Sequence, residues 1–209
     1  MSVFAVLVLL WYVPVIVTTG ITHIFIGDWR RYGARSYYAL YGAGLALCGV
    51  TALLMRYLIR ARIHVPESVS WFGVGAVVVG LGCLLWSYKT LSLRHLAWFA
   101  EIMGDPRDAG DPVRTGPYKL CRNPIYSSAL LVMAGAGLAS GVLTVIVPMI
   151  LLFVLLRIED GELRTRFGAE YEAYAREVPL LFGTKAIRLI RANRTRTSSL
   201  VLADRSTSE

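Results

Sequence analysis

Four long uncharged runs constrain this chain more than any other feature. No Asp, Glu, Lys or Arg occurs in residues 1–27, 36–55, 68–88 or 124–156. Each run reaches the roughly 20 apolar residues that a helix needs to cross a bilayer. The chain is 56% hydrophobic and 17% charged, whereas a soluble domain has about 25% charged residues. The sequence therefore predicts an all-α, polytopic membrane protein.

The first run differs from a signal peptide in three ways. No basic segment precedes it, its apolar stretch is longer than the usual ~7–15 residues, and no small-x-small cleavage site follows. We therefore expect a retained span at about residues 3–25, kinked at Pro14. Two more spans are predicted at about 37–57 and 70–89, with a loop at Asp28–Arg35.

Glycine-rich stretches in the second and third predicted spans offer close helix contact through small residues. These are Gly42-Ala43-Gly44 in the second span and Gly73, Gly75, Gly80 and Gly82 in the third. After the third span, residues 91–103 have apolar side chains at helical spacing and are expected to lie in the membrane interface. Residues 104–112 are rich in Gly, Pro and Asp and are expected to form a loop.

The run at 124–156 is too long for one span and too short for two full ones. As one straight helix it would reach about 50 Å, against about 30 Å of hydrocarbon. Its middle is rich in Gly and Ala, so we predict a short hairpin of helices at 124–138 and 142–160 that turns near Gly141. The hairpin gives about five transmembrane helices and returns both of its ends to one membrane face.

Beyond the hairpin, one apolar stripe recurs at spacings of four, four, three and four: Leu163, Phe167, Tyr171, Tyr174 and Val178. This spacing predicts an amphipathic helix along the cytoplasmic surface. We assign residues 1–182 to the membrane domain and 183–209 to a basic tail, which is expected to be disordered. The arginines of the tail indicate a cytoplasmic C-terminus and, with three spans before the motif loop, an external N-terminus.

The net charge of +8 is explained by attraction to anionic lipid headgroups. We find no motif for nucleic-acid binding. Cys48, Cys83 and Cys121 are not at metal or disulfide spacing, so neither zinc nor a disulfide framework is expected. His23 and His64 are read as interfacial or loop residues.

Polar motifs bracket the hairpin. Before it come Thr115-Gly116-Pro117-Tyr118 and Arg122-Asn123-Pro124, followed by Tyr126; after it come Glu159 and Asp160. Taken singly, Asn123-Pro124 is a good helix start and the tyrosines suit a membrane interface. The acids suit either a solvated surface or pairing with Arg157 and Arg164 along a helix. Two adjacent carboxylates at the end of an apolar helix are nevertheless costly unless water, cations or a ligand compensate them.

The combination resembles the isoprenylcysteine carboxyl methyltransferase family, a group that includes phospholipid methyltransferase-like proteins. The resemblance covers about residues 70–182 and is most specific at 115–126 and 159–179. It implies a methyltransferase that uses S-adenosylmethionine (SAM) and acts on a lipophilic small molecule or lipid at the membrane. The implied cofactor site lies between the hairpin ends, beneath the amphipathic helix.

By this resemblance, Arg122 is the candidate catalytic residue. The implied cofactor-binding residues are Thr115, Gly116, Pro117, Tyr118, Asn123, Pro124, Tyr126, Glu159 and Asp160. Two positions depart from the family pattern. Asn123 replaces a histidine and cannot titrate near pH 7, and Asp160 replaces a glutamate, with a side chain one methylene shorter.

The chemistry of methyl transfer suits these residue types. Transfer from a sulfonium is an in-line displacement, in which positioning supplies much of the catalysis. Carboxylates bind an ammonium or ribose hydroxyls, a tyrosine ring can face a sulfonium, and Arg122 can grip a carboxylate. His95 and Trp98 either border the acceptor site or pack in the interface.

Three alternative functions, a reductase, a transporter and a scaffold, can be compared with the positions of the charged residues and with the altered motifs. A membrane reductase that uses a nicotinamide cofactor would need basic groups for the pyrophosphate, which the acids at 159–160 oppose. A transporter should place polar groups at mid-bilayer, whereas the charges here lie at the ends of the spans. A non-catalytic scaffold with an altered methyltransferase fold is supported by the departures at Asn123 and Asp160.

Overall fold

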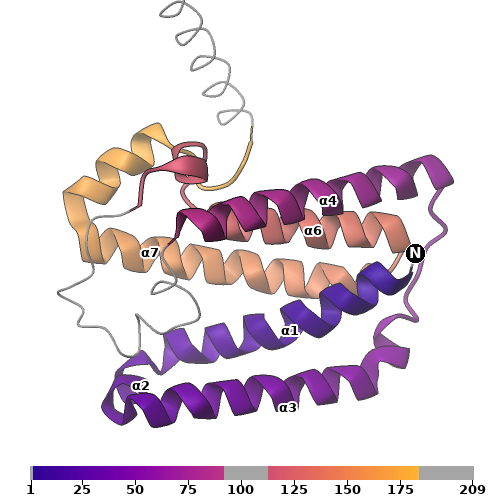
Figure 1. Ribbon diagram of the computed structural model, residues 1–209, viewed down its shortest axis with the longest axis horizontal. Helices are drawn as coiled ribbons and strands as arrows, with labels where there is room; N and C mark the ends of the chain where they lie inside the picture. Colours follow the sequence, from indigo (N-terminus) through magenta and orange to yellow (C-terminus); the bar gives the residue numbers. More distant parts are fainter. Residues whose placement is uncertain (1, 92–112, 184–209) are drawn as a thin grey trace, which may run out of the picture.

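A computed structural model describes residues 2–91 and 113–183, and the described part is built from helices. The elements are α1 (Ser2–Ile24), α2 (Ile26–Tyr32), α3 (Ala34–Leu58), α4 (Glu67–Thr90), the 3-10 turn η3 (Gly116–Lys119), α6 (Pro124–Ser140), the 3-10 turn η4 (Leu143–Val145) and α7 (Ile146–Glu177). The long helices lie side by side along the longest axis of the molecule (Figure 1). The expected interfacial segment at 91–103, the loop at 104–112 and the basic tail at 183–209 lie outside the described residues, apart from Leu91 and Gly183.

Within the described residues, three helices are long and apolar enough to cross a membrane: Val3–Ile24, Tyr38–Leu58 and Glu67–Thr90. The apolar helix Pro124–Ser140 is shorter. Many large apolar side chains on the outside of the bundle are exposed, such as Leu45 (74%) on α3 and Phe72 (71%) on α4. Exposed apolar surface of this extent suits contact with lipid. The prediction of an all-α, integral membrane protein is therefore confirmed.

Helix α1 continues through Pro14. Because proline has no amide hydrogen, the Leu10 carbonyl loses its usual helical donor. The Cys48 thiol of α3 lies 3.6 Å from that carbonyl oxygen and donates a hydrogen bond to it. The proline thus creates an acceptor that ties α1 to α3.

The predicted loop at Asp28–Arg35 is wrong, because its first part is helical. Residues Ile26–Tyr32 form α2, and the Trp29 indole N–H donates to the Ile21 carbonyl at 3.3 Å. Gly33 then takes φ = 52° and ψ = −124°, and α3 follows directly at Ala34. The chain therefore passes from α2 to α3 through a single glycine, in a backbone conformation that residues with a side chain rarely adopt.

The closest helix packing joins α4 to α6. A β-carbon on Gly73 would lie 2.5 Å from the Ala139 amide nitrogen, and one on Gly80 would lie 2.7 Å from the Val132 side chain. Gly75 and Gly82 point elsewhere, since a β-carbon there would meet no described atom within 4 Å. The predicted glycine face of this span is thus half right. In the Gly42–Gly44 stretch, a β-carbon on Gly44 would make ordinary contact with Thr18 of α1, and one on Gly42 would have no described neighbour within 4 Å. No close approach within the described chain therefore depends on these two glycines.

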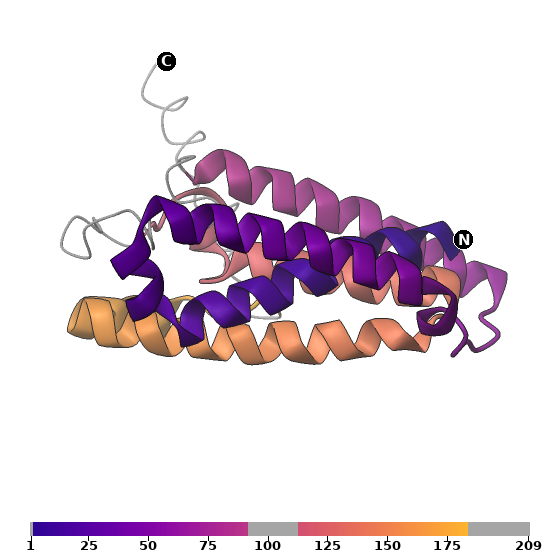
Figure 2. The same cartoon turned by 90° about the horizontal axis from the view of Figure 1, so that it is seen from below.

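The segment after α3 pairs with the turn after α6. The Ile63 amide donates to the Gly141 carbonyl and the Leu143 amide donates to the Ala61 carbonyl, both at 2.9 Å. Gly141 ends α6 in the left-handed conformation, with φ = 69°. These bonds fix the turn that joins α6 to α7 at the end of the molecule where the N-terminus lies (Figure 2).

Buried side chains from four helices form the main core, with Leu9 on α1, Val77 on α4, Met133 on α6 and Leu152 on α7 among them. α7 carries this core and the predicted amphipathic stripe in one element. The helix is interrupted at Gly168 (φ = 54°, ψ = −130°). We call residues 169–177, which follow this break, the C-terminal arm. The predicted amphipathic helix is therefore bent at Gly168 rather than straight.

Candidate functional site

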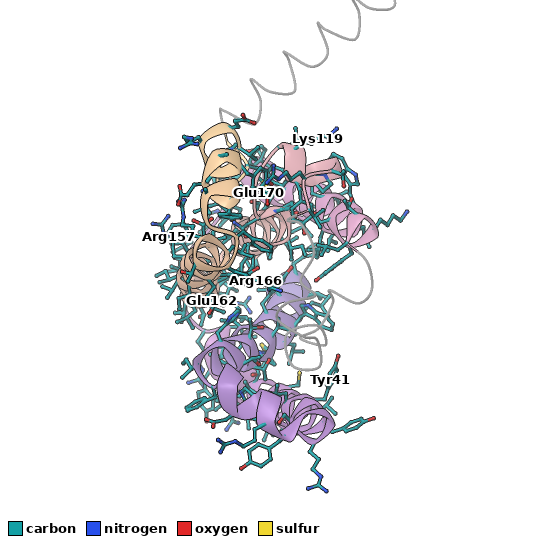
Figure 3. All side chains as sticks on the ribbon, turned by 90° about the vertical axis from the view of Figure 1, so that its left-hand side faces the viewer. Tyr41, Lys119, Arg157, Glu162, Arg166 and Glu170 are labelled. Atoms are coloured by element: carbon teal, nitrogen blue, oxygen red, sulfur yellow. The ribbon has the colours of Figure 1, made fainter. Side chains whose placement is uncertain are left out.

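The two polar clusters meet where α6 begins and the charged half of α7 lies. The Tyr126 hydroxyl donates a hydrogen bond to Glu159 Oε2. Arg122 Nη1 lies 3.3 Å from Asp160 Oδ1. Figure 3 looks onto this end of the molecule, where charged side chains of α7 and Lys119 of η3 gather.

Asp160 is the centre of the contacts. Its side chain is buried, and its Oδ1 accepts a hydrogen bond of 2.8 Å from the Tyr171 hydroxyl of the arm. Its Oδ2 accepts a bond of 3.0 Å from Arg164 Nε. Arg164 in turn pairs with Glu172. The Asp160 carboxylate thus links the segment just before α6, which carries Arg122, to α7 and the arm.

Arg122 and Asn123 are also buried, with residue exposures of 8% and 4%. Among the described residues, no acceptor is hydrogen-bonded to Arg122 Nε, Arg122 Nη1 or Asn123 Nδ2. The backbone amides of the same two residues donate to the carbonyls of Pro179 and Leu180, at 2.8 and 3.3 Å. The backbone is thus anchored, while side-chain donors remain available inside the protein.

Asn123 does not serve as a side-chain cap for α6. It occupies the N-cap position, yet its side chain makes no capping hydrogen bond. Pro124 is the first residue of the helix and is buried, and its carbonyl accepts a bond of 2.7 Å from Ser128. The helix-start explanation therefore accounts for Pro124 but leaves the Asn123 amide unexplained.

The turn η3 fills the space between α4 and the arm. Gly116 has φ = 54°, and a β-carbon there would lie 2.7 Å from Thr90 Oγ1 at the end of α4. Pro117 is buried, and the Tyr118 carbonyl accepts a bond of 2.6 Å from the Tyr174 hydroxyl. Thr115 is exposed and makes no capping bond with its side chain. The structure thus joins Gly116, Pro117 and Tyr118 to the site and leaves Thr115 at its edge.

Burial keeps the hydroxyl and thiol groups of the site protonated. It raises the pKa of Tyr118, Tyr171 and Tyr174 well above the ordinary value for tyrosine, and neighbouring Glu159 raises that of Tyr118 further. Burial also raises the pKa of the Cys121 thiol to about 11. At neutral pH these groups are therefore hydrogen-bond donors and apolar rings rather than anions.

Two guanidinium groups, of Arg122 and Arg164, are paired with two carboxylates, of Asp160 and Glu172. These four side chains form one connected ion-pair network. Glu159 lies next to this network in the sequence and accepts its hydrogen bond from Tyr126. A separate pair, Arg114 with Glu170 at 2.6 Å, is neutral.

Sequence reasoning missed several contributors. His23, expected to be a simple interfacial residue, has its Nδ1 3.0 Å from Glu162 Oε2 and ties the end of α1 to α7. Tyr171 is predicted only as part of the apolar stripe, whereas the predicted alternative that Arg164 pairs with these acids along the helix is confirmed for Asp160. Only the spacing between Asp160 and Arg164, four residues along a helix, signals an ion pair in advance. His95 and Trp98 lie outside the described residues.

No group of three His, Cys, Asp or Glu side chains arranged to hold a metal ion occurs in residues 2–91 and 113–183. The polar side chains brought together here are carboxylates, guanidinium groups, an amide and tyrosines.

Residues 69–170 match the phospholipid methyltransferase family. A cobalt-zinc-cadmium resistance protein, CzcN of Cupriavidus metallidurans, is 39% identical over 154 residues, which cover 64% of this chain and 69% of that protein. The chain belongs to the phospholipid methyltransferase family, within the isoprenylcysteine carboxyl methyltransferase-like group. The resemblance drawn from the motifs is thereby confirmed.

A second relative, the nickel-cobalt-cadmium resistance protein NccN of Alcaligenes xylosoxydans xylosoxydans, is 33% identical over 124 residues. The match covers 57% of this chain and 55% of NccN. No solved structure matches the chain. The range matched to the family extends from α4 to the start of the C-terminal arm, and it contains both polar clusters.

Proposed function

We propose that this protein is a SAM-dependent methyltransferase that acts on a lipophilic acceptor embedded in the membrane. One observation carries the proposal: the hairpin of α6 and α7 brings Tyr126 and Arg122 to Glu159 and Asp160 at one end of an apolar bundle. A water-soluble cofactor and a lipophilic acceptor can meet only at the boundary between the membrane and the aqueous phase. The family to which the chain belongs supplies the reaction class.

The described residues suit SAM in charge and in hydrogen bonding. SAM carries a sulfonium and an ammonium against one carboxylate, so it needs both an anionic partner and hydrogen-bond donors. Glu159 offers a carboxylate for the ammonium or the ribose hydroxyls. Arg122 Nε and Asn123 Nδ2, which have no acceptor among the described residues, offer donors for the cofactor's acceptor atoms. The site therefore offers a carboxylate for the cofactor's ammonium or ribose and N–H donors for its carboxylate.

When bound, the cofactor supplies an electrophilic methyl group, and the protein has to hold and orient it. Tyr126 fixes the Glu159 carboxylate through its hydroxyl. Tyr118 stays neutral and offers its ring to a sulfonium, a contact worth about 0.5–2 kcal/mol. The Tyr174–Tyr118 hydrogen bond ties the arm to η3 next to these residues, and a fixed arrangement of this kind favours positioning as the main source of catalysis.

We further propose five membrane crossings, with the N-terminus outside and the site on the cytoplasmic side. α6 has 17 residues, which corresponds to about 25 Å of helix, close to the hydrocarbon thickness of about 30 Å. The first part of α7 provides the return crossing. The external side then carries the paired segments at 61–63 and 141–143.

The relatives are named as metal-resistance proteins, and we propose that any such role of this chain acts through methylation of a membrane component. The ion pairs of the described site support this, because Asp160 and Glu172 are paired with the guanidinium of Arg164 rather than arranged as ligands of a metal ion. A non-catalytic scaffold is the second candidate, favoured by Asn123 in place of the family's histidine.

Calorimetry of SAM binding to the detergent-purified protein tests the proposal. We expect micromolar binding in the wild type and a loss of about tenfold or more in Glu159→Gln, since a charge-assisted hydrogen bond contributes ~1.5–3 kcal/mol. Glu67→Gln, at the opposite end of α4, is the matched control and should bind as the wild type does. A folded wild-type protein that binds no SAM would overturn the proposal and leave the scaffold.

A further inference from the structure

Asp160 has little capacity left for a ligand. Each of its two oxygens accepts a hydrogen bond, from Tyr171 at 2.8 Å and from Arg164 at 3.0 Å, and its first oxygen is also 3.3 Å from Arg122 Nη1. The side chain is 4% exposed. A cofactor ammonium or ribose would have to displace these partners, whereas the neighbouring Glu159 is only partly buried.

Arg122, in contrast to Asp160, keeps hydrogen-bonding capacity for a ligand. Its guanidinium is held by the Asp160 carboxylate and lies 5.7 Å from the centre of the Tyr171 ring. Its Nη1 is the atom that faces Asp160, at 3.3 Å, whereas its Nε hydrogen has no acceptor within the described part of the chain, although the residue is buried. A buried donor left without a partner costs about 1–3 kcal/mol, and more in a charged group. Such a group is stabilised by an incoming anion.

Asn123, the next residue in the chain, adds a second donor that lacks an acceptor within the described residues. Its Nδ2 is buried and has no acceptor among the described residues, and its backbone is fixed by the bond from its amide to the Leu180 carbonyl. A planar guanidinium with a neighbouring amide matches the two oxygens of a carboxylate, because both groups donate N–H bonds in fixed directions.

On the basis of the proposed function, we propose that Arg122 and Asn123 form a carboxylate-binding subsite, and that Asp160 positions Arg122 instead of touching the cofactor. The substitution of aspartate for the family's glutamate agrees with this division. The shorter side chain stays near the helix, where it reaches Arg122, Arg164 and Tyr171. Two ligands of the reaction can bring the carboxylate: the methionyl part of SAM, or a lipophilic acid that serves as the acceptor.

Whether the methionyl part of SAM supplies the carboxylate is tested with a pair of cofactors that differ only in that group. Binding of SAM and of decarboxylated SAM is measured by calorimetry on the wild type, Arg122→Gln, Asp160→Asn and the control Arg157→Gln, which changes an exposed arginine of α7. We expect the wild type and the control to prefer SAM by about tenfold, as the loss of a charged hydrogen bond predicts. Arg122→Gln should lose the preference and bind decarboxylated SAM as the wild type does.

Asp160→Asn separates positioning from direct contact. A positioning residue predicts that its loss weakens SAM and spares decarboxylated SAM, because the effect passes through Arg122. Equal weakening of both cofactors would show that Asp160 contacts the ammonium or ribose, and would overturn the positioning role. Tyr171→Phe, which removes only the hydroxyl bonded to Asp160, gives the same readout if Asp160→Asn does not fold.

The second source is tested with palmitate and its primary alcohol, in the presence of S-adenosylhomocysteine. Binding of the acid that falls about tenfold in Arg122→Gln, with binding of the alcohol unchanged, assigns the subsite to the acceptor. If neither ligand pair shows a carboxylate preference that depends on Arg122, the subsite does not exist. Failure of the wild type to bind either cofactor would instead refute the proposed function, so the two failures are distinguishable.

Discussion

At the scale of single residues, Cys121 shows how burial controls reactivity. The residue is fully buried, its Sγ lies 3.5 Å from Ser127 Oγ, and burial raises its pKa from 9.0 to about 11. The thiolate is the reactive form, so at pH 8 the shift alone slows alkylation roughly hundredfold. We expect iodoacetamide to modify Cys121 at least that much more slowly in the native protein than in denaturant, measured by mass spectrometry of its peptide.

The same shift affects stability at alkaline pH. Because the pKa is raised in the folded state, the stabilisation is fully present below about pH 9 and is lost as the pH rises through about 11. Native protein whose Cys121 reacts at pH 8 as fast as unfolded protein would contradict the burial of this thiol.

The sequence indicates which residues form the site but not how they share the work. In the sequence motif, Glu159 and Asp160 are two adjacent carboxylates whose roles are not distinguished. Successive residues of a helix point about 100° apart, so one carboxylate faces Tyr126 and the other turns into the protein toward Arg122. The partners of Asp160 come from the segment just before α6, from α7 and from the arm, and no local pattern predicts such a convergence.

Among the elements, α7 depends on Gly168. Its φ of 54° and ψ of −130° lie in a region that is essentially restricted to glycine and costs other residues about 1–3 kcal/mol. A β-carbon would meet no described atom within 4 Å, so the strain is in the backbone alone. We expect Gly168→Ala to loosen the arm and speed hydrogen exchange of residues 169–177, read by mass spectrometry. Gly161→Ala, in the same helix with no such conformation, is the control and should leave exchange unchanged.

The contact of α4 with α6 offers a second test at this scale. Gly73→Ala places a methyl group 2.5 Å from the Ala139 nitrogen, whereas Gly75→Ala meets no described atom within 4 Å. We expect the first change to lower stability by ~1–3 kcal/mol through overpacking and the second to be neutral or slightly stabilising. Thermal unfolding in detergent measures both. Equal melting temperatures for the two variants would show that α4 does not approach α6 through Gly73.

Elements were predicted well where the apolar pattern is long, and less well where a helix passes from lipid to water. The spans at 3–25, 37–57 and 70–89 correspond to α1, α3 and α4 within a few residues. The helical α2 was missed because polar residues near a turn are compatible with both loop and helix. Which glycines touch α6 depends on the rotation of α4 about its axis, and four glycines spaced along the span do not fix that rotation.

For the whole molecule, the paired segments after α3 and α6 tie two parts of the chain to one side of the membrane. Ile63 and Leu143 each donate a backbone bond across this pair, so residues near them must share a compartment whatever the orientation. The site lies at the other end, where α4 ends, α6 begins and Gly116 packs on Thr90. The α6–α7 hairpin therefore separates the external turn from the proposed cofactor site by one membrane thickness.

Single cysteines in a cysteine-free background test this arrangement. With the N-terminus outside and the site in the cytoplasm, we expect an impermeant maleimide to label Arg62→Cys and Leu143→Cys in intact cells, and to label Arg31→Cys only after permeabilisation. All three positions are exposed. Labelling of Arg31→Cys alone in intact cells would invert the orientation but keep the fold, because Arg62→Cys and Leu143→Cys would still behave alike. Labelling of Arg62→Cys without Leu143→Cys would break the pairing itself, and with it the five-span hairpin.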